Sequence, residues 1–178
     1  MSTLPYSPRP ATEADLEQVA KIEGQSIRPP WGVDAFRAEL DKPHSKFWVV
    51  TDNETDEKVY AYAVFSYPAD QAHLITFAVH PDFRRRGMAI YLLRQIISFV
   101  MRKGGESVIL EVRKGNGAAV ALYQKLGFMV IRTLPAYYPD KEDGFVMIYK
   151  TEREKLSGDP DADFDAEPSA SDGKTNFN

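Results

Sequence analysis

The sequence predicts a domain of the α/β (α+β) class, with a mixed, mostly antiparallel central sheet of six to seven strands and about four flanking helices. Segments rich in β-branched and aromatic residues alternate along residues 1–150 with segments whose apolar residues recur at helical spacing. Three strand-like segments follow one another directly, which predicts an antiparallel front half. Helices separate the later strands, and this makes the whole sheet mixed.

Capping and turn residues predict where the first two helices begin. After a first short strand, Thr12 and Asp15 resemble a capping box, with aspartate in place of the usual Glu or Gln. Helical spacing then follows at Leu16, Val19 and Ala20. A second helix over about residues 33–40 comes after the turn Pro29-Pro30-Trp31.

Three consecutive strands are predicted from their composition. They cover Phe47–Thr51, Val59–Phe65 and Ala72–Val79. The polar segment 52–58 is the turn of a hairpin between the first two strands.

The longest helix follows His80-Pro81, and Gly104-Gly105 ends it. A strand over 108–112 comes next, after which Asn116 as N-cap and Gly127 at C′ bracket the last helix. Strands over 128–134 and 145–149 close the sheet. The apolar stripe of the long helix is Ala89, Leu92, Leu93, Ile96, Ile97 and Val100.

The acidity of the chain is concentrated in its last part. Of 22 basic and 26 acidic residues, 3 basic and 8 acidic ones lie from Thr151 onward, which leaves 19 basic and 18 acidic residues in 1–150. Residues 151–178 also have few large apolar side chains, so we expect an acidic disordered tail behind a single domain over 1–150. The near-neutral domain makes nucleic-acid binding a weak hypothesis.

Cysteine is absent, which excludes disulfides, zinc–thiolate sites and a covalent mechanism through a cysteine nucleophile. The three histidines have no metal-ligand spacing, so no metal site is expected. No apolar run is long enough to span a membrane, and no secretory signal is evident. We therefore expect a cytoplasmic protein.

An anion-binding turn is predicted between Phe77 and Ala89. An apolar strand leads there into Arg84-Arg85-Arg86, then into Gly87 and the long helix. The N–H groups and the dipole at a helix N-terminus favour a phosphate. A Walker P-loop would need Gly-Lys-Ser/Thr and a Rossmann turn three spaced glycines, and neither is present. A solvated basic turn without a ligand is the alternative.

The pattern Arg84-x-x-Gly87-x-Ala89 resembles the pyrophosphate-binding signature of the GCN5-related N-acetyltransferases (GNAT), which bind acetyl-coenzyme A (acetyl-CoA). A longer match, similar to the RimI branch of that family, comprises Leu110 to Phe128, Pro30-Trp31 and Tyr137-Tyr138-Pro139. Members of this branch acetylate a protein N-terminus. The resemblance covers about residues 9–150 and implies the GNAT fold. The substrate that it implies is the N-terminal alanine of small ribosomal subunit protein eighteen.

The resemblance also implies that Glu111 is the general base and Tyr123 the general acid. Glu111 would take a proton from the attacking α-amine, directly or through water, and the task is modest because that amine has a pKa of about 7.7–8. Tyr123 would protonate the departing CoA thiolate. Strand alternation places Glu111 on the less apolar face, as it would a solvated carboxylate. The helical period places Tyr123 on an apolar stripe, as it would a core tyrosine.

Acetyl-CoA is expected along the predicted strand Ala72–Val79 and the start of the long helix. By the resemblance, the main chain of Phe77, Ala78 and Val79 would bind the pantetheine arm, and the Val79 N–H would stabilise the oxyanion. Asn116 also matches a cofactor-contacting position of the family. The residues of the pyrophosphate cradle are Arg85, Arg86, Gly87, Met88, Ala89 and Ile90.

The substrate N-terminus is expected at Glu23, Trp31, Tyr137 and Tyr138, although aromatic packing alone could also explain the aromatic residues. The branch usually has asparagine where Thr76 stands. Two other functions stay open: the same fold acting on a small-molecule amine or a lysine side chain, and a non-catalytic acyl-CoA-binding module. A wide acidic pocket around the tyrosine pair would favour a polyamine.

Overall fold

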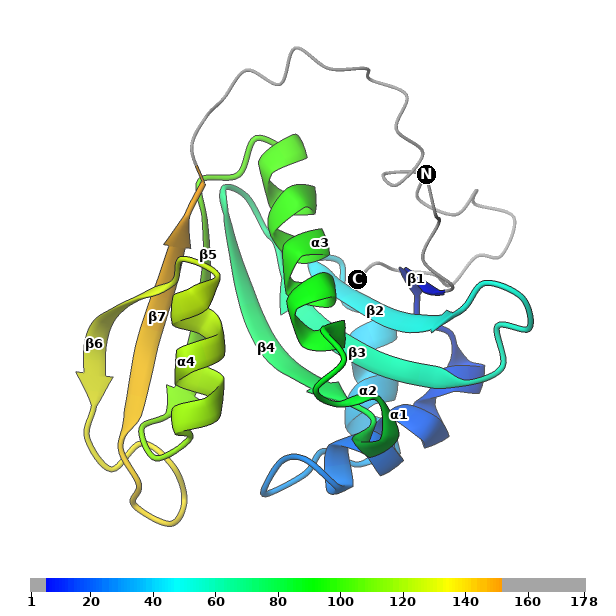
Figure 1. Ribbon diagram of the computed structural model, residues 1–178, viewed down its shortest axis with the longest axis horizontal. Coiled ribbons are helices and arrows are strands. Elements are labelled where there is room, and N and C mark those ends of the chain that lie inside the picture. Colours follow the sequence, from blue (N-terminus) through cyan, green and yellow to red (C-terminus); the bar gives the residue numbers. More distant parts are fainter. Residues whose placement is uncertain (1–5, 152–178) are drawn as a thin grey trace.

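A sheet of seven strands in the order β1-β2-β3-β4-β5-β7-β6 forms the centre of the computed structural model, which describes residues 6–151 (Figure 1). Only the β4–β5 pair is parallel among the paired strands of this sheet. The predicted mixed sheet with an antiparallel front half is thus confirmed. The strands are β1 (Tyr6–Pro10), β2 (Ser45–Asp52), β3 (Val59–Ser66), β4 (Gln71–Val79), β5 (Ser107–Arg113), β6 (Met129–Leu134) and β7 (Gly144–Lys150). The helices are α1 (Leu16–Gly24), α2 (Val33–Leu40), α3 (Met88–Arg102) and α4 (Gly117–Lys125).

The first strand contains two prolines. Pro8 and Pro10 lie opposite Val50 and Trp48 of β2. Because β1 is at the edge of the sheet, one of its sides needs no ladder hydrogen bonds, and proline is tolerated there. The predicted capping box follows at once, with the Thr12 N–H donating to the Asp15 carboxylate at 2.7 Å, so the chain turns directly from β1 toward α1.

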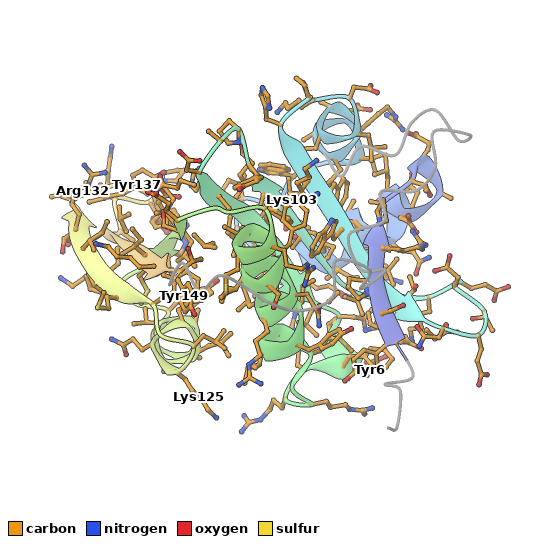
Figure 2. The ribbon with its side chains drawn as sticks, turned by 90° about the horizontal axis from the view of Figure 1, so that it is seen from above. Tyr6, Lys103, Lys125, Arg132, Tyr137 and Tyr149 are labelled. Atoms are coloured by element: carbon orange, nitrogen blue, oxygen red, sulfur yellow. The ribbon has the colours of Figure 1, made fainter. Side chains whose placement is uncertain are left out.

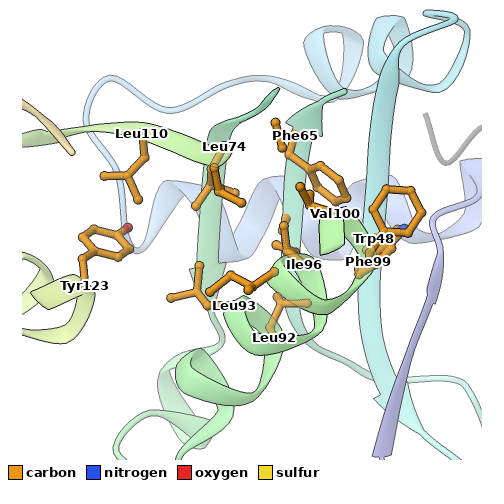
Figure 3. Packing of buried hydrophobic residues seen from close by; sticks show 14 of the residues in the cluster. Trp48, Phe65, Leu74, Leu92, Leu93, Ile96, Phe99, Val100, Leu110 and Tyr123 are labelled. Atoms are coloured by element: carbon orange, nitrogen blue, oxygen red, sulfur yellow. The ribbon is translucent and has the colours of Figure 1, made fainter. Parts of the chain in front are cut away.

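Helices cover both faces of the sheet. On one face, α1 and α2 pack on β2 and β3, with the Phe36 ring centroid 5.6 Å from that of Phe47 and 5.4 Å from that of Tyr62. On the other face, α3 and α4 bury a larger cluster that includes Trp48, Leu92 and Tyr123 (Figure 3). In Figure 1, α3 and α4 lie in front of the sheet, and α1 and α2 lie behind it.

Strands β4 and β5 diverge after a short pairing. They pair only from Gln71–Ser107 to Leu74–Leu110. Just beyond this point the register between β3 and β4 shifts at Ile75, where β4 has one extra residue, and such a bulge bends a strand. Figure 1 shows β4 bending away from β7 and α4. The remainder of β4 and residues 111–113 of β5 are therefore not paired with each other.

The described chain ends just after β7. The Thr151 N–H donates to the Glu106 carbonyl at 2.9 Å, which ties this residue to the start of β5. Residues 152–178, which make up almost all of the predicted acidic tail, lie outside the described residues, as do residues 1–5. Between residues 6 and 151, no helix is long and apolar enough to cross a membrane.

Candidate active site

The main chain of β4 presents polar groups where it diverges from β5. The His80 N–H donates to the Tyr60 carbonyl at 2.8 Å, and hydrogen-bonded pairs alternate along an antiparallel ladder. Ala78 and its partner on β3 are therefore the next hydrogen-bonded pair, and the main-chain groups of Phe77 and Val79 point away from β3. Three residues were predicted to hold pantetheine. The main-chain polar groups of Phe77 and Val79 point into the space where β4 and β5 separate, which we call the divergence, whereas those of Ala78 form hydrogen bonds with β3.

The turn before α3 has the geometry of an anion cradle. Gly87 caps the helix at a φ of 82°, in the left-handed region that favours glycine. The first helical hydrogen bond runs from the Tyr91 N–H to the Gly87 carbonyl at 2.9 Å, so the N–H groups of residues 88–90 are not used within the helix. The turn lines a pocket of about 300 Å³ formed by Val79, Arg84, Arg85, Gly87, Met88, Ala89, Ile90 and Leu122. A phosphate fits such a set of donors.

The three arginines of this turn have different surroundings. Arg84 donates from Nε to the Val79 carbonyl at 3.1 Å and from Nη2 to the Ser26 hydroxyl at 2.8 Å. Arg84 therefore ties the end of β4 to the chain after α1. Because it occupies the Val79 carbonyl, the Val79 N–H is the main-chain group of this residue that stays free toward the divergence. The Arg86 guanidinium lies 5.6 Å from the Phe83 ring centroid, and Arg85 lines the pocket. Two of the three arginines, Arg84 and Arg85, therefore line the pocket at the cradle.

Glu111 lies on the face of β5 opposite Leu110, which belongs to the cluster under α3. Its Oε2 atom is 2.6 Å from Nε2 of His73 on β4. The hydrogen bond with Glu111 raises the pKa of His73, and burial opposes this rise only in part. The sequence did not identify His73 as a site residue, because only the β4–β5 register, which pairs His73 with Ile109, brings it beside Glu111.

Tyr123 is a core residue whose hydroxyl end faces the divergence. Figure 3 shows its ring reaching from α4, with the hydroxyl end directed toward Leu110 and Leu74. Burial raises the pKa of Tyr123 to about 12, and Tyr138 adds to the rise. Among residues 6–151 the hydroxyl has no hydrogen-bond partner. The Tyr123 ring therefore packs in the core, as a core tyrosine would, while its O–H remains available to a ligand.

The N-terminus of α4 lies at the end of β5. The Asn116 side chain accepts a hydrogen bond from the Ala119 N–H at 3.2 Å, which confirms the predicted N-cap. At the other end of α4, Gly127 has a φ of 99°, as predicted for a C′ glycine. These local caps fix the two ends of the helix that carries Tyr123.

Glu23, at the end of α1, is fully buried. Its carboxylate accepts hydrogen bonds from the Tyr62 hydroxyl, from Thr76 Oγ1 at 3.1 Å and from the Trp31 N–H at 3.3 Å. Burial raises the pKa of Glu23, and the bonds from Trp31 and Thr76 lower it in part. Glu23 therefore supports the loop of Trp31 from inside the protein, with Tyr62 and Thr76 as partners that the sequence did not identify.

Arg113 joins two loops on the face of Glu111. Its Nη1 donates to Asp140 at 2.8 Å and to Glu142 at 2.7 Å, in the loop 135–143 before β7. Its Nη2 donates at 3.0 Å to the carbonyl of Arg28, in the loop between α1 and α2 that also carries Trp31. The loops that hold the predicted substrate residues are thus connected through one guanidinium.

The tyrosine pair lies beside this guanidinium. The Tyr138 ring centroid is 4.0 Å from the Arg113 guanidinium and 5.1 Å from the Tyr137 ring centroid. Tyr137 is 52% exposed, and in Figure 2 it lies on the opposite side of β6 and β7 from Lys125 at the end of α4. Burial raises the pKa of Tyr138, Arg113 lowers it, and Tyr137, Glu111 and Glu142 add to the rise.

Glu111 and Tyr123 approach the divergence of β4 and β5 from opposite faces of the sheet. Tyr138 interacts electrostatically with both, since it adds to the raised pKa of Tyr123 and Glu111 adds to the raised pKa of Tyr138. A ligand that passes between the two strands would meet the carboxylate on one side and the hydroxyl on the other. Within the described part of the chain, no group of three or more His, Asp or Glu side chains could hold a metal ion.

Comparisons with known proteins identify the family of this chain. Residues 16–128 match the acetyltransferase (GNAT) family. The ribosomal protein bS18-alanine N-acetyltransferase of Escherichia coli (strain K12) is 32% identical over 136 residues, which cover 75% of this chain and 89% of that protein. The N-alpha-acetyltransferase RimI of Mycobacterium tuberculosis (strain ATCC 25618 / H37Rv) is 34% identical over 133 residues, which cover 71% and 80%.

A solved structure shows the same arrangement of strands and helices. The crystal structure of the ribosomal-protein-S18-alanine N-acetyltransferase from Escherichia coli matches with a TM-score of 0.76 at 29% identity, over 86% of this chain and 99% of that one. Ard1 from Thermoplasma volcanium matches with a TM-score of 0.76 at 27% identity, over 84% and 99%. With more than half of its length matched to the family, the chain belongs to the acetyltransferase (GNAT) family and is an acyltransferase.

Proposed function

We propose that this enzyme transfers the acetyl group of acetyl-CoA to the α-amine of a protein N-terminus, and that the N-terminal alanine of ribosomal protein bS18 is its substrate. The names of two relatives, which specify bS18-alanine and N-alpha acetylation, support this assignment. A ribosomal-protein substrate also agrees with the cytoplasmic location expected from the sequence.

One observation favours a peptide over a polyamine. The loop 135–143 is acidic, but Arg113 binds Asp140 and Glu142, and Lys114 lies 3.6 Å from Asp143. Each carboxylate in this described loop therefore has a cationic partner. A polyamine site would need free carboxylates there, whereas a peptide N-terminus needs only a path to the base and contact area for its first residues.

The described residues fit coenzyme A. The unused N–H groups at the start of α3 suit the pyrophosphate, and the left-handed Gly87 lets its phosphates approach the backbone. Phe77 and Val79 provide a free strand edge for the amides of pantetheine, in the manner of β-augmentation. Arg85 and Arg86 would add positive charge, and the capped N-terminus at Asn116 would flank the thioester end.

Glu111 acts as the general base in this proposal. It takes a proton from the amine as the N–C bond to the acetyl group forms, which gives a tetrahedral intermediate, and the C–S bond of the thioester breaks when this intermediate collapses. The Val79 N–H, which faces the divergence, donates to the oxyanion of the tetrahedral intermediate. Because the chain has no cysteine, no acetyl-cysteine intermediate can form on it, which is compatible with direct transfer.

Tyr123 supplies the proton for the leaving sulfur. A tyrosine with the ordinary pKa of about 10 is already protonated at neutral pH, and burial, which raises the pKa of Tyr123 to about 12, keeps the hydroxyl in this donating form. The phenolate that results regains a proton from water. On the other side of the sheet, Trp31, Tyr137 and Tyr138 would contact the peptide, and Glu23 would hold the loop of Trp31 in place.

A panel of short peptides with acetyl-CoA, followed by mass spectrometry, tests the substrate assignment. One peptide carries the N-terminal sequence of bS18, others change only its first residue, and spermidine is added as a polyamine. We expect the bS18 peptide to be acetylated with the highest kcat/KM. Faster acetylation of spermidine than of every peptide would contradict the proposal.

A further inference from the structure

The side chain of His73 forms a pair with Glu111 across the last paired residues of β4 and β5. Nε2 of His73 and Oε2 of Glu111 are 2.6 Å apart, within the range of a charge-assisted hydrogen bond. The two side chains are 40% and 23% exposed, so both can be reached by water and by a ligand. A titratable imidazole therefore lies directly against the proposed general base.

We propose that His73 is a positioning residue for Glu111: its neutral ring orients the carboxylate for the substrate amine, and protonation of the ring weakens the base. The inference rests on the proposed function, because it assigns a role within the same acetyl transfer. It adds a residue that neither the cradle nor the predicted catalytic pair contains.

The neutral form orients the base. With the proton on Nε2, the ring donates to Oε2, which restricts the rotation of the carboxyl group and leaves Oε1 for the amine. As the amine attacks, its proton passes to Glu111, the N–C bond forms and the C–S bond breaks. His73 gains and loses no proton in this step, so it acts only through Glu111.

The charged form has the opposite effect. A proton on Nδ1 gives the ring a positive charge beside the carboxylate, and an adjacent cation makes a carboxylate a weaker base. The hydrogen bond with Glu111 raises the pKa of His73 above its ordinary value, so this form persists to a higher pH than in a free histidine. Below that pKa the base is weakened, and above it Glu111 is free to act.

The other charged groups that face the pair are already engaged. On β5, Arg113 is bound to carboxylates of the loop 135–143, and from that loop Tyr138 stacks on the same guanidinium. From α1, Glu23 is held by hydrogen bonds inside the protein. The neighbouring strand β7 places an apolar residue, Val146, opposite Glu111. The imidazole is therefore the group best placed to change the charge next to the base.

The test compares the pH dependence of kcat/KM for peptide acetylation in the full chain and its variants. The amine of the substrate contributes one acid limb in every enzyme. In the wild type, protonation of His73 should lower kcat/KM further below the His73 pKa, so that the slope of log(kcat/KM) against pH approaches about two. In His73→Gln the slope should stay at about one. Glutamine can donate the hydrogen bond but cannot become charged, so its rate at high pH should stay close to that of the wild type.

Two further variants complete the comparison. His73→Ala, which removes both the donor and the charge, should lower kcat over the whole pH range, and the exposed His44→Gln should leave the profile unchanged. Titration of the imidazole by NMR gives a readout without substrate: the His73 pKa should fall in Glu111→Gln. A His73→Gln profile equal to that of the wild type, or an unchanged His73 pKa in Glu111→Gln, overturns the inference alone. If the wild type acetylates no peptide, the proposed function fails as well.

Discussion

The Arg113 guanidinium lies 2.7 Å from the Glu142 carboxylate, and through this contact β5 is joined to the loop that carries the tyrosine pair. The same side chain binds Asp140 and the carbonyl of Arg28, so it spans both loops on the substrate side. Arginine suits this position because its planar guanidinium carries five donors in fixed directions, whereas the lysine ammonium is a compact charge with three donors and no such fork. The proposed peptide site thus depends on a residue two positions after the base.

Replacing Arg113 should weaken peptide binding more than acetyl-CoA binding. In Arg113→Lys the two loops lose their shared donor, and we expect the peptide KM to rise roughly ten- to a hundredfold. Steady-state kinetics with the bS18 peptide measures this change, and calorimetry with CoA should show little effect. Arg37→Ala, which removes an exposed ion pair with Glu13, is the matched control. An unchanged peptide KM in Arg113→Lys would separate these loops from substrate binding.

Replacing Glu111 should remove the proposed general base without closing the proposed cofactor site. In Glu111→Gln we expect kcat to fall by roughly 10²–10⁴ at neutral pH. The affinity for acetyl-CoA should be kept, because other residues form the cradle before α3 and the free edge of β4. Single-turnover acetylation of the peptide measures the chemical step. Turnover equal to that of the wild type would remove Glu111 from the mechanism.

Tyr123→Phe should slow acetyl transfer while leaving the core packed, because the ring is kept and the hydroxyl has no partner among residues 6–151. The folded-state pKa of about 12 lies above the ordinary value of about 10, so the folded protein holds this proton more tightly. The resulting stability is present below pH 10 and is lost as pH rises toward 12.

Alkaline denaturation therefore separates the wild type from Tyr123→Phe. Between pH 10 and 12 the wild type should lose up to about 1.4 kcal/mol of unfolding free energy per pH unit more than the variant. If Tyr123→Phe instead unfolds at a clearly lower temperature at neutral pH and keeps full activity, the residue serves packing only.

Gly87 offers a test of the cradle with a close control. Its φ of 82° and the φ of 77° at Gly104 are both left-handed, and a Cβ at either position would meet open space. Gly87→Ala and Gly104→Ala should therefore each cost about 1–2 kcal/mol of unfolding free energy. Only Gly87→Ala should also weaken CoA binding, since Gly104 lies at the other end of α3. Equal CoA affinities for the two variants, measured by calorimetry, would contradict the cradle.

Local signals predicted the elements well because their causes are local. Asn116 caps α4, and Gly104 and Gly127 take left-handed conformations after α3 and α4, each within a few residues of the helix that it bounds. The first strand is different, since the proline-rich start of the chain does not locate it. It forms because an edge strand tolerates proline on its unpaired side.

The site was predictable only in part. Sequence motifs point to Glu111, Tyr123 and the cradle, but His73 and Glu111 are 38 positions apart, and their pairing depends on the register between β4 and β5. The bulge at Ile75, which separates β4 from β5, likewise arises from pairing with β3. The burial of Glu23 also depends on a distant part of the chain, because its partner Tyr62 is 39 residues away. Such relationships exist only after the sheet has formed.

We propose above that the enzyme acetylates an α-amine. The most direct measurement uses one peptide that begins with the N-terminal alanine of bS18 and contains an internal lysine, incubated with acetyl-CoA and fragmented in the mass spectrometer. We expect the acetyl group on the N-terminal alanine, and no modification of the same peptide with a blocked N-terminus. Acetylation of the lysine in both peptides, with a free α-amine left on the first, would contradict the proposal.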